Sequence, residues 1–209
     1  MSQYLAIHPE TPQPRLLSRA VEVVREGGVI VVPTDSCYAL GCRLGDKAAL
    51  DRIREIRRVD DRHHMTLMCR DLSEIAQYAR VDNAQYRLLK ATTPGSYTFI
   101  LEGTKELPRR VLHPKRKTIG LRVPDHKVLQ ALLEELDEPL LTTTMQLPED
   151  EMAMTEGWEI QDRLDGRVDL VLDGGTCGTE PTTVVDLTGG VPELIRAGCG
   201  PLGPLGLEG

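Results

Sequence analysis

Residues 27–42 read GGVIVVPTDSCYALGC, and this stretch decides the fold class. Its residues 29–32 form a continuous apolar run that a proline ends, which is typical of a strand buried on both faces of a helix-covered sheet. The two glycines before the run are the stop expected after a helix, and residues 16–25 place apolar side chains at helical spacing. A helix followed at once by a buried strand predicts an α/β fold.

The same alternation continues along the chain. Helices are predicted from residue 46, from residue 71, and at 82–90, 125–136 and 158–164; strands are predicted at 65–68, 97–101, 118–123, 140–144, 168–172, 183–187 and 193–196. Because the last strands are closely spaced and can pair antiparallel, we expect a twisted mixed sheet with flanking helices. We expect a single domain over residues 1–198, a mobile loop at 145–157 and a flexible tail at 199–209.

Composition narrows the class of protein. The chain has 209 residues, 40% of them hydrophobic but only 3% aromatic, so one core can form from aliphatic side chains. The net charge of -7 argues against a surface devoted to nucleic acid and leaves a local basic cavity open. Five cysteines without a Cys-x-x-Cys pair argue against a disulfide framework and a zinc ribbon. With neither a signal peptide nor a membrane-length apolar run, we expect a cytoplasmic protein without a membrane partner.

The usual nucleotide and hydrolase motifs are absent from the sequence. It has no Walker loop, no Gly-x-Gly-x-x-Gly opening a helix, no His-Glu-x-x-His and no Gly-x-Ser-x-Gly. Any nucleotide is therefore held in another way. Thr34, Ser36 and Tyr38 follow a buried strand, where α/β sheets bind ligands, so their hydroxyls are candidates for a small polar substrate. The alternative is an ordinary turn with Asp35 as its cap.

Basic residues gather at two places in the chain. Four arginines at the end of the second helix suit a triphosphate, or they only complement the helix dipole; they are Arg54, Arg57, Arg58 and Arg62. Lys115–Lys117, near two further arginines, fit a basic cavity or a solvated loop. We expect His63 and His64 to face solvent, and the sequence predicts no metal site. The threonines of 142–144 are ligand candidates or satisfy a strand edge.

Five ordered segments carry a resemblance to a known family. They read GVIVVPTD at 28–35, YALGC at 38–42, PGSYT at 94–98, TIGLRVP at 118–124 and PTTVVD at 181–186. Together they resemble the YrdC/YciO family from residue 5 to about residue 198. The phrases TLMCRDLSE at 66–74 and YTFIL at 97–101 are similar to its YciO branch.

The resemblance implies both a fold and a reaction. The fold is a YrdC/RibB-like twisted open mixed sheet that encloses a large basic cavity. The reaction joins L-threonine and bicarbonate to ATP, which expels pyrophosphate and forms threonylcarbamoyl-AMP for N6-threonylcarbamoyladenosine in tRNA. ATP is expected as a substrate with Mg²⁺, and no tightly bound cofactor is expected. The resemblance assigns no oligomeric state.

The resemblance also assigns site residues by position. Thr34 contacts the threonine substrate and Arg122 its carboxylate, and the other substrate-binding positions are Tyr38, Cys69, Thr118, Thr182 and Thr183. The nucleotide-binding positions are Arg57, Arg58, Arg62, Thr98, Thr144, Gln146 and Arg196.

Two signatures of the family are altered in this chain. The family's Lys-x-Arg reads Arg57-Arg58-Val59, and its Ser-x-Asn reads Thr144-Met145-Gln146. Because misplacing a positioned group by about 1 Å costs on the order of a hundredfold in rate, we expect a weak synthase or one with an altered substrate. Two alternatives stay open: a protein that binds double-stranded RNA, tRNA or the ribosome, and a nucleotide-binding regulator.

Overall fold

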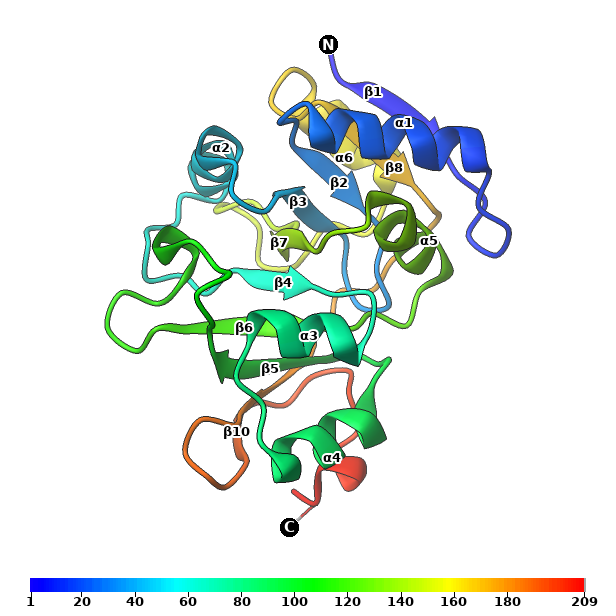
Figure 1. The fold of residues 1–209 in the computed structure, drawn as a ribbon. Helices are drawn as coiled ribbons and strands as arrows, with labels where there is room; N and C mark the ends of the chain where they lie inside the picture. The colour runs from blue at the N-terminus through cyan, green and yellow to red at the C-terminus, as the bar shows by residue number, and fades with distance from the viewer. Residues whose placement is uncertain (209) are drawn as a thin grey trace.

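A mixed sheet of ten strands runs through the computed structural model, which describes residues 1–208 (Figure 1). Its strands are β1 (Gln3–Ala6), β2 (Ile30–Val32), β3 (Ala39–Arg43), β4 (Thr66–Met68), β5 (Tyr97–Glu102), β6 (Thr118–Arg122), β7 (Leu140–Thr144), β8 (Leu170–Asp173), β9 (Thr183–Asp186) and β10 (Glu193–Arg196). They lie in the order β1-β8-β2-β3-β7-β4-β6-β5-β9-β10. Parallel pairs (β1 with β8, β2 with β8, β4 with β6, β5 with β9) mix with antiparallel ones, which confirms the predicted mixed sheet.

Aspartate side chains cap three of the helices within residues 1–208. The helices are α1 (Pro14–Arg25), α2 (Lys47–Arg57), α3 (Leu72–Tyr78), α4 (Asn83–Thr92), α5 (Lys127–Leu136) and α6 (Gly157–Leu164), with short 3-10 turns at Arg109–Val111 and Gly203–Leu205. Asp46, Asp71 and Asp82 each accept a hydrogen bond from the backbone N–H three residues later. Such a cap contributes about 1 kcal/mol, so these aspartates fix the first residues of α2, α3 and α4.

Strand β2 packs apolar side chains on both of its faces. Ile30 and Val32 belong to a core cluster that also contains residues of α1 and α5. Val31 belongs to a second cluster that contains residues of α2 and α6. Because alternate residues of a strand point to opposite faces, the two clusters lie on opposite sides of β2. The predicted two-sided burial of residues 29–32 is confirmed.

Residues 145–157 pack against the domain, so the prediction of a mobile loop there is wrong. Met145, Leu147 and Met154 are buried. The Met145 N–H donates to the Tyr38 carbonyl over 2.8 Å, and the Met154 N–H donates to the Met145 carbonyl over 3.1 Å. The prediction followed the acidic residues, which are visible in the sequence. The residues that Met145, Leu147 and Met154 pack against come from other parts of the chain and are not visible there.

The segment after residue 198 also packs against the domain, where the sequence predicts a flexible tail. The Tyr97 hydroxyl donates to the Pro201 carbonyl over 2.6 Å, and the Cys199 N–H donates to the Pro181 carbonyl over 2.9 Å. Leu205 is only 5% exposed. The glycines and prolines of this segment form turns that hold it against β5 and the 181–183 region; residue 209 lies outside the described residues.

None of the helices within residues 1–208 is long and apolar enough to cross a lipid bilayer.

We expect Leu205→Ala to lower the free energy of unfolding by about 2–5 kcal/mol, the range for removing a buried leucine side chain. The loss follows from the cavity that the substitution opens between the C-terminal segment and the core. Urea unfolding measures it, with Glu208→Ala as the exposed control in the same segment. An unchanged midpoint for Leu205→Ala would show that the segment does not pack in solution.

Candidate active site

A cavity of about 780 Å³ opens over one face of the sheet. Thr66 of β4 pairs with Gly120 of β6 on one side and with Thr142 of β7 on the other, so these three residues form one row across the sheet. Strand residues two positions further on lie on the same face. The floor of the cavity is therefore built from alternate residues of the central strands: Thr66, Met68, Thr98, Ile100, Gly120, Arg122, Thr142 and Thr144.

Gly120 keeps the middle of this floor open. A Cβ atom at residue 120 would lie 2.9 Å from the Thr98 side chain and 3.4 Å from the Thr66 hydroxyl. The first distance is shorter than carbon atoms tolerate without a shift. Any other residue at position 120 would fill the space between β4 and β5 that the cavity occupies.

Arg122 is a buried cation at the carboxyl end of β6, with 6% of its surface exposed. Its Nη2 donates to the Asp35 carboxylate, and its Nη1 donates to the Ser36 hydroxyl over 3.3 Å. The second carboxylate oxygen of Asp35 accepts from the Ser96 hydroxyl at 3.1 Å and from the Asp125 N–H at 3.0 Å. Burial lowers the pKa of Arg122, and Asp35 opposes that shift. The buried Nε of Arg122 has no hydrogen-bond partner within residues 1–208.

Arg57 reaches the cavity from the last turn of α2. Its Nη1 donates to the Thr143 hydroxyl over 3.1 Å and to the Thr144 carbonyl. The same Thr143 hydroxyl lies 2.9 Å from His63 Nε2. Burial lowers the pKa of Arg57, and burial together with Arg57 lowers the pKa of His63. The end of α2, the following loop and β7 therefore join in one hydrogen-bonded cluster, and Arg62 lines the cavity beside it.

His64 also lines the cavity, so the prediction that His63 and His64 face solvent is wrong for both. His64 Nε2 lies 3.3 Å from the Thr118 hydroxyl, and its ring stacks on His113 with 5.2 Å between the ring centroids. Burial lowers the pKa of His64, and His113 adds to the shift. Two adjacent polar residues after a helix usually face solvent, which is why the sequence predicts exposure. In the structure, the loop after α2 places both side chains in the cavity lining.

Arg196 contributes a further cation from β10. Its Nη2 donates to the Thr182 carbonyl over 2.9 Å. The Thr182 hydroxyl lies 2.7 Å from the Thr98 hydroxyl, and all three residues line the cavity. The wall opposite α2 is therefore held by β5, β9 and β10.

The residues expected at the site divide into two groups. Those that line the cavity are Tyr38, Arg57, Arg62, Thr98, Arg122, Thr144, Gln146, Thr182 and Arg196. Besides the arginines and threonines described above, two of these residues are hydrogen-bonded within the protein. The Tyr38 hydroxyl donates to the Gly175 carbonyl and contacts Asp173, and the Gln146 amide donates to the Asp150 carbonyl over 3.1 Å.

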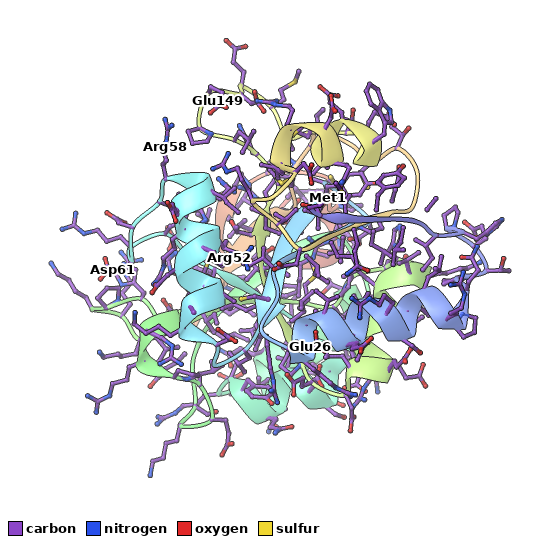
Figure 2. The ribbon with its side chains drawn as sticks, turned by 90° about the horizontal axis from the view of Figure 1, so that it is seen from above. Met1, Glu26, Arg52, Arg58, Asp61 and Glu149 are labelled. Atoms are coloured by element: carbon purple, nitrogen blue, oxygen red, sulfur yellow. The ribbon has the colours of Figure 1, made fainter. Side chains whose placement is uncertain are left out.

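Five expected residues do not line the cavity. Cys69 and Thr183 are each next in sequence to a residue that lines the cavity, Met68 and Val184. Because neighbouring residues of an extended chain point to opposite faces, Cys69 and Thr183 point away from the cavity, and both are fully buried. Arg58 adopts a left-handed conformation that ends α2, and its side chain points away from the molecule (Figure 2). The Thr34 hydroxyl is used inside its own turn, where it donates to the Cys37 carbonyl. Thr118 lies against His64.

Sequence reasoning missed several residues that shape the cavity. The sequence predicts Asp35 only as a turn cap, because no local pattern shows that it meets an arginine 87 positions later. The 151–153 stretch of the supposed mobile loop lines the cavity as well. Within residues 1–208, no group of three or more His, Cys, Asp or Glu side chains is placed to hold a metal ion.

The mixed sheet and the arginines that line its cavity define an α/β protein built around one large polar cavity. The model of the Sua5, YciO and YrdC family, described as telomere recombination, matches residues 22–198. The chain therefore belongs to the Sua5/YciO/YrdC family, which confirms the resemblance.

Individual relatives agree with this assignment. YciO of Escherichia coli K12 is 56% identical over 204 residues, which cover 98% of this chain and 99% of YciO. The crystal structure of E. coli YciO superposes with a TM-score of 0.94, covering 98% of this chain and all of that one. Human threonylcarbamoyl-AMP synthase is 32% identical over 193 residues, which cover 88% of this chain and 67% of the synthase. P. abyssi Sua5 complexed with L-threonine, at 23% identity and a TM-score of 0.87, shares the fold; the match covers 94% of this chain and 58% of Sua5.

We expect Asp35→Ala to lower the free energy of unfolding by about 3–5 kcal/mol, because it leaves the Arg122 charge buried without a partner. Adding Arg122→Met to the same chain removes that charge and should recover much of the loss. Urea unfolding at pH 7 measures both variants. A double variant as unstable as the single one would mean that the ion pair is not what stabilises this region.

Proposed function

We propose that this protein is an ATP-dependent synthase that forms threonylcarbamoyl-AMP from L-threonine, bicarbonate and ATP, with weak turnover or an altered substrate. The observation that carries the proposal is a pair of arginines in one cavity: Arg122 is buried on its floor, and Arg57 lines its wall at the end of α2. Membership of a family that includes human threonylcarbamoyl-AMP synthase supports it. The product would serve N6-threonylcarbamoyladenosine formation in tRNA.

The amino acid would bind at the Arg122 end of the cavity. A guanidinium fork suits a carboxylate, and the buried Nε of Arg122 is a donor still without a partner within residues 1–208. The hydroxyls of Ser36 and Thr182 line the same region and suit a small polar side chain. The L-threonine bound by P. abyssi Sua5, which shares the fold, supports threonine as the ligand.

The triphosphate would bind at the α2 end of the cavity. Arg57 and Arg62 line that wall, and Arg196 faces the cavity from β10. Mg²⁺ would arrive with ATP as part of the substrate, bridging phosphate oxygens and keeping several waters. Arg58 is not part of this site, because it points into solvent.

The reaction needs positioning and charge stabilisation more than covalent help from the protein. The threonine nitrogen bonds to the bicarbonate carbon with loss of water, which gives N-carboxy-threonine. A carboxylate oxygen of that intermediate attacks the α-phosphorus of ATP, the bond from the α-phosphorus to the α,β-bridging oxygen breaks, and pyrophosphate leaves with that oxygen. Arginines fixed around the phosphates would stabilise the charge that develops in this displacement.

The altered signatures support weak turnover. Val59 offers no cation where the family keeps the arginine of Lys-x-Arg, and the Gln146 amide is held by the Asp150 carbonyl in its own loop. An amide that already donates within its own loop is less available to orient a ligand. We therefore propose slower adenylate formation than in a synthase with both signatures.

We expect pyrophosphate release with ATP, Mg²⁺, L-threonine and bicarbonate, and loss of release when threonine or bicarbonate is omitted. Arg57→Met should raise the KM for ATP about tenfold to a hundredfold, because a hydrogen bond to a charged group contributes about 1.5–3 kcal/mol. Arg58→Met is the matched control, since it removes the neighbouring exposed guanidinium, and it should leave the KM unchanged. Release that is independent of threonine and of Arg57 would overturn the proposal.

A second candidate, binding of duplex RNA or tRNA, rests on a basic loop beside the cavity. Lys115, Arg116 and Lys117 are exposed, and their loop is anchored by His113, whose ring stacks on His64 in the cavity wall. Exposed cations of this kind suit a phosphate backbone.

For this candidate we expect affinity for a duplex RNA to fall steeply from 50 to 200 mM salt, because phosphate contacts release counterions. Replacing Lys115 and Arg116 by glutamine should make that salt dependence shallower. Fluorescence anisotropy with a labelled duplex measures both. Absence of RNA binding at the lower salt concentration would exclude this candidate. A protein that binds nucleotide but neither turns it over nor binds RNA would be a nucleotide-binding regulator.

A further inference from the structure

The phosphate end of the cavity contains a titratable side chain beside its main cation. His63 follows α2 in the loop that also carries Arg62, and both line the cavity with Arg57. His63 and Arg57 contact the same Thr143 hydroxyl, at 2.9 and 3.1 Å. A single hydroxyl therefore links His63, whose charge can change near neutral pH, to the arginine expected to hold phosphate.

The Thr143 hydroxyl limits how His63 is protonated. Arg57 donates to the Thr143 oxygen, so the hydroxyl hydrogen is free to point at His63 Nε2 when the imidazole is neutral. His63 Nδ1 makes no hydrogen bond within residues 1–208 and is left for solvent or a ligand. The neutral ring is thus satisfied on one side and open on the other.

The charges around His63 favour the neutral ring while no anion is bound. Arg57 and Arg54 of α2 and the adjacent His64 oppose protonation, Asp60 in the same loop favours it, and burial opposes it most. The neighbour from β7, Thr143, carries no charge. Arg62, Arg122, Arg196 and Glu151 are the other charged residues that line the cavity. A polyanion placed here would reverse the balance, because an opposite charge within about 4–6 Å favours the charged form of a side chain.

We propose that His63 is a second phosphate-binding cation of this site, which takes up a proton when a polyphosphate binds beside Arg57. The inference rests on the proposed role of the α2 end in holding the triphosphate. The His63 ring would be neutral beside Arg57 when the cavity is empty. It would become charged when phosphate oxygens neutralise Arg57. Binding a polyphosphate would therefore consume a proton, and affinity would rise as pH falls.

The experiment follows the five histidine rings by NMR between pH 5 and pH 8, with and without inorganic pyrophosphate. The His63 signal is the one lost in His63→Gln, a variant whose side-chain amide oxygen can accept from the Thr143 hydroxyl as the neutral imidazole does. The pKa of His63 should rise by about one unit or more when pyrophosphate is added, the range for an adjacent opposite charge. His8 and His126, which do not line the cavity, report general effects of the anion in the same spectra.

Isothermal titration of pyrophosphate at pH 8 and pH 5.5 gives the second readout. From the higher to the lower pH, the affinity of the natural protein should increase about tenfold more than that of His63→Gln, which corresponds to one pKa unit. Pyrophosphate itself titrates in this range, but it does so equally for both proteins, so the ratio isolates His63.

Each outcome decides a different point. If pyrophosphate binds, and Arg57→Met abolishes the binding, while the pKa of His63 stays unmoved, the phosphate site stands and the role of His63 is overturned. Equal weakening of binding by His63→Gln at both pH values would reduce His63 to a neutral support for Thr143 and also overturn the inference. Absence of any pyrophosphate binding from pH 5 to pH 8 would overturn the phosphate site together with it.

Discussion

The buried ion pair between Asp35 and Arg122 is the constraint on which the cavity depends. Asp35 lies in the loop after β2, and Arg122 ends β6, while β3, β7 and β4 stand between those two strands in the sheet. Burying a guanidinium carries a large desolvation cost, so its carboxylate partner must be held in place by further hydrogen bonds. Ser96 and Asp125 supply them. The loop after β2 is thereby drawn across the sheet, and the space that it encloses with the strand face is the cavity.

The chemistry of the cavity follows from which side chains this frame leaves available. Alternation along β4, β6 and β7 places threonines, Gly120 and the buried cation Arg122 on the floor, and two further cations enter from the rim: Arg57 from a helix end and Arg196 from an outer strand. Arg57, Arg122 and Arg196 all have lowered pKa values because they are removed from water, yet guanidinium groups stay charged under such shifts. Charges that are poorly solvated before a ligand arrives lose less hydration when an anion binds.

Much of the fold was predictable from the sequence because its signals are local. The strands at 140–144 and 193–196 have the predicted bounds, and three aspartate caps mark helix starts. Strand β1 was missed because four alternating residues give too little pattern, and β3 because its glycine and cysteine read as part of the preceding loop. The cavity residues were found mostly through the family resemblance. The Asp35 contact and the inward turn of His63 depend on partners far along the chain, which no local pattern reveals.

The position of β8 in the sheet sets an order for folding during synthesis. Strands β1 and β2 leave the ribosome early, but they do not pair with each other: both pair with β8, formed by residues 170–173. In a nascent chain, β1 and β2 therefore each have an unpaired edge until β8 is synthesised. Unpaired strand edges can form non-native pairs and aggregate. Helix α1 follows β1 directly, and its apolar face packs with α5 and with β2 in the finished domain. The part of the sheet encoded first is thus among the last to be completed.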